Sequence, residues 1–172
     1  MSNFDVLVDC ELDRHDWSQI VEAHGPATNV PVALRQLLAS TTENDVQAAY
    51  WRLENHAFVS GGLFEAALPL VSALLAALVD FDRPHIVRGW LLELLFQIVN
   101  GYSHADERAR GRVDLDEQCR EAARGGLWLM YRLFQDGFEC ELTSEIIRRI
   151  DPDKSRLSII QERNAAQGRS FE

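Results

Sequence analysis

The chain has 172 residues, of which 47% are hydrophobic and 26% are charged, a balance typical of a globular domain and not of a disordered chain. Its formal net charge of −10 argues against binding to a nucleic-acid backbone, where a basic patch supplies most of the affinity. The chain has only five prolines and few β-branched runs, which favours an all-α fold. Its length suits a single domain over residues 1–172.

Residues 1–28 are predicted to form an acidic N-terminal arm and helix. Residues 1–12 are expected to be extended, with a short strand within FDVLVDC, and the first helix is expected over about 13–23. The arm carries six carboxylates and one arginine, and therefore half of the net negative charge. Trp17 lies among these carboxylates, and an exposed tryptophan in such a setting is a typical interface anchor.

Residues 29–150 contain a repeat of paired helices. Pro31 and Pro69, 38 residues apart, each open an apolar run that is followed by a polar break and a second amphipathic run. Two helices per ~40 residues are typical of a HEAT-type α-solenoid. The predicted helices of this region are 30–39, 43–58, 64–79, 84–100, 114–136 and 143–150, with Gly125-Gly126 inside the fifth of them.

Asp151-Pro152 interrupts the pattern, and residues 151–172 are predicted to form a C-terminal capping helix and a tail. The predicted fold is all-α: a short right-handed α-solenoid of HEAT-like helix pairs with about eight helices. Its two terminal helices are polar, as solenoid caps are, which favours a monomer when the protein is free.

The segment 63–79 is apolar but shorter than the ~20 residues that a bilayer requires, and we expect it to be a central helix and not a membrane span. The N-terminus does not have the pattern of a signal peptide. The three cysteines, Cys10, Cys119 and Cys140, form neither a disulfide framework nor a zinc motif. A cytoplasmic protein is therefore expected.

No motif for catalysis, for a metal or for a cofactor is present. The five histidines do not have metal-ligand spacing, and neither a phosphate-binding glycine loop nor a serine-nucleophile motif occurs. The three tryptophans within predicted helices, Trp51, Trp90 and Trp128, are expected to pack in the core. These patterns predict a protein that binds a partner and is not an enzyme.

Two pairs of opposite charge resemble those that join successive HEAT repeats. Asp82 and Arg88 are six residues apart, and Asp45 and Arg52 are seven apart. In HEAT-type repeats an Asp in the turn between paired helices and an Arg about six residues on bond across repeats and hold the stack. We expect both pairs to have this structural role.

The helices VPVALRQLLAS and NDVQAAYWRLENHAF, the link VSGGLFEAALP and the later run DEQCREAARGGLWLMYRLFQDG together resemble the small HEAT-repeat-like proteins of bacteria. Many of those proteins are encoded beside secreted polymorphic toxins. The resemblance covers about three-quarters of the chain and leaves out the acidic arm 1–28. It implies an immunity protein that stays in the cytoplasm and neutralises a cognate toxin domain by blocking its active site or its substrate access. Many such toxins are basic, which suits an acidic inhibitor.

Partner-binding residues are expected at three places. The second helices of HEAT pairs line the concave face, which solenoids often use for binding, so the polar side of the predicted helix 43–58 comes first. The polar loop 101–113 and the acidic N-terminal helix are the other two. The residues are Glu43, Asp45, Gln47, Arg52 and Glu54, then Tyr102, Asp106 and Glu107, and then Asp13, Asp16 and Trp17.

Two other functions remain open from the sequence. One is a HEAT-like scaffold or adaptor for another protein partner. The other is an enzyme on a helical-repeat scaffold, such as a DNA glycosylase or a bilin-type lyase. A repair glycosylase should have a basic concave groove, which the acidic composition does not favour.

Overall fold

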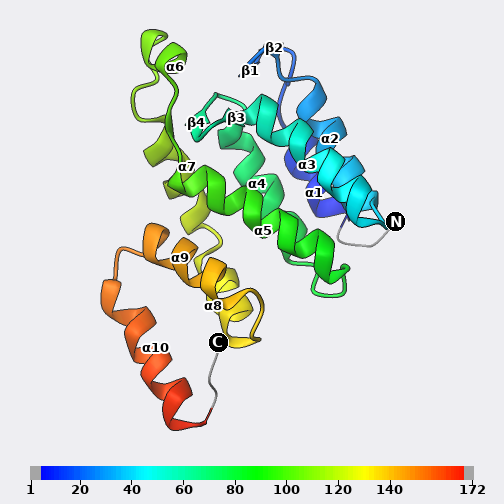
Figure 1. Cartoon of the computed structure of the whole chain (residues 1–172). Coiled ribbons are helices and arrows are strands. Elements are labelled where there is room, and N and C mark those ends of the chain that lie inside the picture. The colour runs from blue at the N-terminus through cyan, green and yellow to red at the C-terminus, as the bar shows by residue number, and fades with distance from the viewer. Residues whose placement is uncertain (1–4, 169–172) are drawn as a thin grey trace.

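The computed structural model describes residues 5–168, and this part of the chain is mostly helical, with ten helices and two small sheets (Figure 1). The prediction of a helical protein is confirmed, but the helices number ten and not eight. They are α1 (Asp5–Asp13), α2 (Asn29–Ala39), α3 (Glu43–Ala57), α4 (Ala67–Leu78), α5 (His85–Asn100), α6 (Ala105–Ala109), α7 (Leu115–Arg124), α8 (Leu127–Gln135), α9 (Cys140–Ile150) and α10 (Lys154–Ala166). The end of the predicted tail, 169–172, lies outside the described residues.

The strands are two residues long and lie together with α6 at one end of the molecule (Figure 1). They are β1 (Val21–Glu22), β2 (Gly25–Pro26), β3 (Phe58–Val59), β4 (Gly62–Leu63) and β5 (Tyr102–Ser103). β1 pairs antiparallel with β2, while β4 lies between antiparallel β3 and parallel β5. The second sheet thus joins the chain that follows α3 to the chain that follows α5.

Helix α4 lies at the centre of the fold, in contact with α1, α5 and α7. Its sequence, ALPLVSALLAAL, is apolar on every side, and a helix of this kind is stable only when neighbours cover it all round. Pro69 is the third residue of α4 and therefore marks its first turn without kinking it. No helix in the described part of the chain is long and apolar enough to cross a membrane.

Helices α3, α5 and α9 lie side by side, with α5 in contact with both of the others (Figure 1). Each is the second helix of a sequential pair: α2 packs on α3, α4 on α5, and α8 on α9. The helices predicted over 30–39, 43–58, 64–79, 84–100 and 143–150 are all present, and their ends differ from the prediction by at most a few residues.

The prediction for the N-terminal segment is wrong, because the helix lies earlier in the chain than expected. Residues 5–13 form α1, whereas the region predicted as a helix, 13–23, contains turns and strand β1. Val8 and Leu12, one helical turn apart, are buried in the core, which favours a helix where a strand was expected. Trp17 follows in the turn, where its indole N–H donates to the Leu12 carbonyl at 2.7 Å and satisfies one of the free carbonyls at the end of α1.

The helix predicted over 114–136 is in fact two helices, α7 and α8, separated by Gly125-Gly126. A Cβ atom at Gly126 would overlap the side chain of Leu75 in α4, so the glycine allows α4 to approach the break. Asp114 precedes α7 without a side-chain cap, and Glu117 bonds to Arg120, so the spacing of Asp114 and Glu117, which is that of a capping box, does not produce one.

Neither of the two predicted inter-repeat ion pairs forms. Arg88 donates to the Phe81 carbonyl, and its guanidinium lies 4.1 Å from the centre of the Phe138 ring, where cation–π attraction replaces an ion pair. Arg52 donates to Gln36 Oε1 at 2.6 Å and so joins α3 to α2 within one pair.

The polar loop 101–113 contains β5, α6 and a carboxylate, Glu107, that is fully buried. Glu107 accepts hydrogen bonds from Arg110 at 2.7 Å and from Arg112 at 3.1 Å. Arg112 also pairs with Glu65 at 2.7 Å, and Glu65 accepts from the Val21 backbone N–H at 3.0 Å. This chain of bonds ties three loops together at the sheet end of the molecule.

We expect Glu107→Gln to lower the free energy of unfolding by about 2 kcal/mol, because it replaces two charge-assisted hydrogen bonds at a buried site. Urea denaturation measures this loss. The matched control is Glu145→Gln, which breaks an ion pair with Arg148 in which both side chains are half exposed, and it should cost less than about 1 kcal/mol. Equal losses for the two variants would contradict the structural role of Glu107.

The packing of α7 predicts the reactivity of its cysteine. Burial raises the pKa of the Cys119 thiol to about 12, whereas Cys10 is exposed. Iodoacetamide at about pH 8 should therefore alkylate Cys10 in the native protein and should reach Cys119 only after unfolding, because the thiolate is the reactive form. Peptide mass spectrometry distinguishes the sites, and native labelling of Cys119 at the rate of Cys10 would contradict this packing.

Candidate functional site

An open groove of about 680 Å³ lies where α3, α5 and α9 meet. It is lined by residues of all three helices and by Glu139, which directly precedes α9. The lining consists of Tyr50 and Trp51 from α3, His85, Ile86, Gly89, Trp90 and Glu93 from α5, and Glu139 and Leu142 beside them. We treat these nine residues as the candidate site and call them the α3–α5–α9 groove.

Three aromatic rings form one side of the α3–α5–α9 groove. The Tyr50 ring centre lies 5.4 Å from that of Trp51 and 4.6 Å from that of Trp90, distances typical of aromatic pairs. Trp51 is 49% exposed and Trp90 is partly buried. The prediction that Trp51 packs in the core is therefore wrong, and the same holds for Trp128, which is 69% exposed.

Helical spacing places each groove tryptophan on one face of its helix with the residues one turn before and after it, although Gln47 and Glu54 of α3 do not themselves line the groove. Gln47, Trp51 and Glu54 follow each other at i, i+4 and i+7 along α3, and Ile86, Trp90 and Glu93 do so along α5. Both helices therefore present a tryptophan followed one turn later by a glutamate.

Glycine at position 89 leaves space in the groove. A Cβ atom there would meet only Glu139 Oε1, at 3.8 Å. A glycine inside a helix costs about 1 kcal/mol relative to alanine, so the missing side chain in the N-terminal half of α5 is not explained by helix stability.

The groove is acidic. Burial raises the pKa of the Tyr50 hydroxyl, and the negative charges of Glu54 and Glu93 raise it further, so Tyr50 stays protonated at neutral pH. Glu93 accepts a hydrogen bond from Gln97 at 2.7 Å. None of the lining residues is a lysine or an arginine.

Glu139 is held in an uncommon backbone conformation. Its φ of 42° and ψ of 55° lie in the left-handed region, which glycine adopts more readily than other residues. Its carboxylate lies 3.9 Å from the His85 ring nitrogen, and both side chains reach water. A strained, charged residue at the rim of a groove is an arrangement often found at functional sites.

The five partner-binding residues predicted on α3 divide between two sides of that helix. Gln47 and Glu54 lie on the face that carries Trp51, and Glu43 continues this face toward the start of the helix. Asp45 accepts from the Thr42 hydroxyl, and Asp45 and Arg52 both line a separate pocket against α2. None of the five lines the groove itself, although Gln47 and Glu54 lie on the face of α3 that carries Trp51.

The predicted residues of the 101–113 loop lie apart from the groove. Tyr102 and Asp106 follow the C-terminal end of α5, whereas the groove is lined by its N-terminal half. Tyr102 is exposed, and its hydroxyl donates to the Ser60 carbonyl at 3.4 Å. Glu107 is fully buried and offers no surface to a partner. The prediction that it contacts a partner is therefore wrong, and its role is structural.

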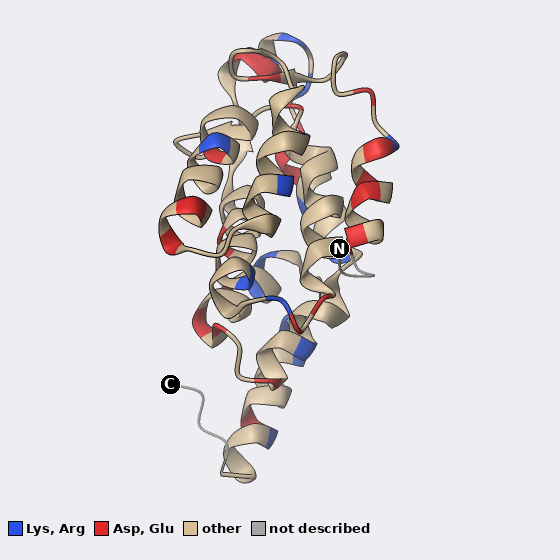
Figure 2. Cartoon of the chain, turned by 90° about the vertical axis from the view of Figure 1, so that its right-hand side faces the viewer, with Lys and Arg blue, Asp and Glu red and all other residues tan. Residues whose placement is uncertain are grey.

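The predicted N-terminal residues also need correction. Trp17 is 8% exposed and bonds to the end of α1, so it is a core residue and not an exposed anchor. Asp13 is exposed and pairs with Arg35 of α2 at 3.1 Å. Asp16 is exposed and accepts hydrogen bonds from Ser18 in the following turn. Figure 2 shows the acidic residues spaced along α1, beside the N-terminus.

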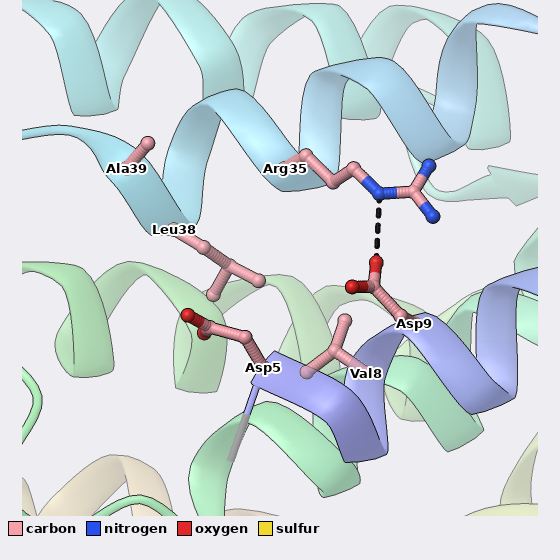
Figure 3. A pocket seen from close by; sticks show the side chains of 6 residues that line it. All are labelled: Asp5, Val8, Asp9, Arg35, Leu38 and Ala39. Atoms are coloured by element: carbon pink, nitrogen blue, oxygen red, sulfur yellow. Dashed lines mark hydrogen bonds and ion pairs between the residues drawn. The ribbon is translucent and has the colours of Figure 1, made fainter. Parts of the chain in front are cut away.

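A second pocket, of about 240 Å³, lies between α1 and α2 (Figure 3). Arg35 Nε donates to Asp9 Oδ1 at 2.9 Å across its opening, and Val8 and Leu38 form its apolar side. The only basic group among its lining residues is thus already paired with a carboxylate of the neighbouring helix. We assign this pocket a structural role in holding α1 against α2.

The partner-binding residues predicted from the sequence include none of the nine groove residues, and those missed include Trp90, Glu93, Glu139 and Leu142. One signal could have indicated it: the motif Trp-x-x-Glu occurs in the second helix of two successive pairs, at Trp51 and at Trp90. Within the described residues, no group of three or more His, Cys, Asp or Glu side chains could hold a metal ion.

Comparison of the chain with protein-family models, with curated proteins and with solved structures finds no match. The groove itself is open, aromatic and acidic, and three helices contribute to it.

The two groove tryptophans should differ in their effect on stability. Trp51→Ala should change the free energy of unfolding by less than about 1 kcal/mol because half of the side chain already faces water. Trp90→Ala should cost at least about 2 kcal/mol because it removes packing against Tyr50. Urea denaturation compares the variants, and a larger loss for Trp51→Ala would mean that Trp51 is a core residue after all.

Proposed function

We propose that this protein is a cytoplasmic immunity protein that binds a cognate bacterial toxin domain through the α3–α5–α9 groove and neutralises it by covering its active site or its substrate access. The observation that carries the proposal is the half-exposed Trp51, which lies in an open groove against the rings of Tyr50 and Trp90. An exposed tryptophan in a recess reduces solubility, and protein interfaces are enriched in such anchors. The proposal includes no chemistry by the protein itself.

The order of the helices supports a HEAT-like solenoid as the framework. The second helices α3, α5 and α9 adjoin one another, as they do in a stack of helix pairs, and the groove is formed on their row. In a regular stack, α2 as the first helix of its pair would pack against α4, the first helix of the next pair. Here α1 packs against α4 instead, which departs from that pattern. In our proposal the stack is right-handed and the free protein is a monomer.

Charge supports a basic partner. The chain has a formal net charge of −10, and the groove lining contains two carboxylates without a lysine or an arginine. Opposite charge accelerates the encounter of two proteins and disfavours wrong partners. The same charge opposes the phosphate backbone of a nucleic acid, which is the substrate of a repair glycosylase.

Capture from the native bacterium tests the proposal. Tagged full-length protein should retain one small basic protein at physiological salt, and the Trp51→Ala variant should retain at least about tenfold less, because interface aromatics dominate binding energy. The captured protein, expressed alone in a bacterial host, should stop growth, and co-expression of this chain should restore it.

Trp128→Ala is the matched control, since Trp128 is also exposed but lies outside the groove. It should capture the partner as well as the unaltered protein does. A captured partner that has no effect on growth would favour the scaffold or adaptor function. Loss of capture by Trp128→Ala and not by Trp51→Ala would contradict the assignment of the groove.

A further inference from the structure

We propose that the α3–α5–α9 groove recognises an arginine side chain of the partner, with its guanidinium against the indole of Trp51 and its charge opposite Glu93 and Glu139. This inference rests on the proposed function and deepens it by naming the group that enters the groove. The supporting observations are the half-exposed Trp51 indole, the charge of the lining and the space above Gly89.

The protein itself places arginines on two of its other exposed aromatic rings, Trp128 and Phe81. The Arg156 guanidinium lies 5.3 Å from the Trp128 ring centre, and the Arg88 guanidinium lies 5.3 Å from that of Phe81. No arginine or lysine within the described residues takes this position over Trp51 or Trp90. The groove therefore has the aromatic half of a cation–π contact, and a partner can provide the cationic half.

The carboxylates favour a cation over a purely apolar occupant. Glu139 is 43% exposed, and an apolar side chain packed over it and Glu93 would remove water from two charges without replacing its hydrogen bonds. A cationic side chain would compensate both charges. A phosphate or a carboxylate would be repelled.

Arginine suits the groove better than lysine. Its planar guanidinium stacks on aromatic faces and can donate to carboxylates on more than one side, whereas a lysine ammonium is a compact and more strongly hydrated charge. The flanking Ile86 and Leu142 offer apolar contact to the side-chain stem or to neighbouring apolar residues of the partner.

Capped peptides test the inference on the folded, full-length protein. One peptide carries a central arginine between two leucines, and the other carries citrulline, which has nearly the same shape without the charge. Binding is followed by NMR at the indole N–H signals of the tryptophans. The arginine peptide should shift the Trp51 and Trp90 signals and bind at least about fivefold more tightly than the citrulline peptide. The Trp128 signal, whose ring already has Arg156 beside it, should stay in place.

Four variants locate the site. Glu93→Gln and Glu139→Gly should each weaken binding of the arginine peptide by at least about threefold, and Glu162→Gln on α10 should leave it unchanged. Glu139→Gly also relaxes a left-handed backbone position, so reduced binding by that variant cannot be attributed to lost stability. Gly89→Leu should abolish binding by filling the groove.

Equal binding of the arginine and citrulline peptides, or shifts at Trp128 in place of Trp51, would overturn the inference. Its failure can be told apart from failure of the proposed function. If the Glu93→Gln variant still restores growth and binds the toxin with unchanged affinity, the immunity function is supported and the arginine contact is rejected. If the protein binds the arginine peptide selectively but the capture experiment retains no toxin, the arginine contact is supported and the immunity function is rejected.

Discussion

The fold depends on one constraint: α4 is apolar on every side and must be covered on every side. Helices α1, α5 and α7 provide that cover, and the approach of the α7–α8 break is close enough to require glycine at position 126. Because one face of α5 is used to cover α4, its opposite side is left to meet α3 and α9. The groove is thus a consequence of how the central helix is buried.

The polar groups that this packing buries differ in their partners from the polar groups that it leaves accessible to water. Charged residues near the core are paired: Glu107 with two arginines, Glu22 with His56 at 2.6 Å, and Asp80 with Arg83 at 3.3 Å. Buried charges are stable in proteins only with such partners. The carboxylates of the groove reach water, and their partners are Gln97 for Glu93 and His85 for Glu139, so no arginine or lysine of the described chain is paired with either.

Sequence patterns were sufficient for the helices with clear apolar stripes and strong end signals, such as α3, whose Thr42 cap bonds to the Asp45 N–H. They failed in the N-terminal segment, where Val8 and Leu12 have the spacing of a helix but the acidic residues between them resemble an exposed arm. They also failed at Gly125-Gly126, where α7 ends and α8 begins beside the side chain of Leu75, about fifty residues earlier in the chain, because local periodicity does not show this contact. The predicted site included Glu54, which lies beside Tyr50, but placed Trp17 and Glu107 on a surface that they do not reach.

The sequence by itself determined that the protein is helical and strongly acidic, because helical periodicity and net charge are properties of the chain alone. Only the tertiary structure decided which side chains are buried. Periodicity shows how residues are arranged around one helix, but burial depends on the neighbour that covers each face. Trp17 lies among carboxylates in the sequence and Trp51 follows Ala-Ala-Tyr, yet the end of α1 covers the first, and nothing within the described chain fully covers the second.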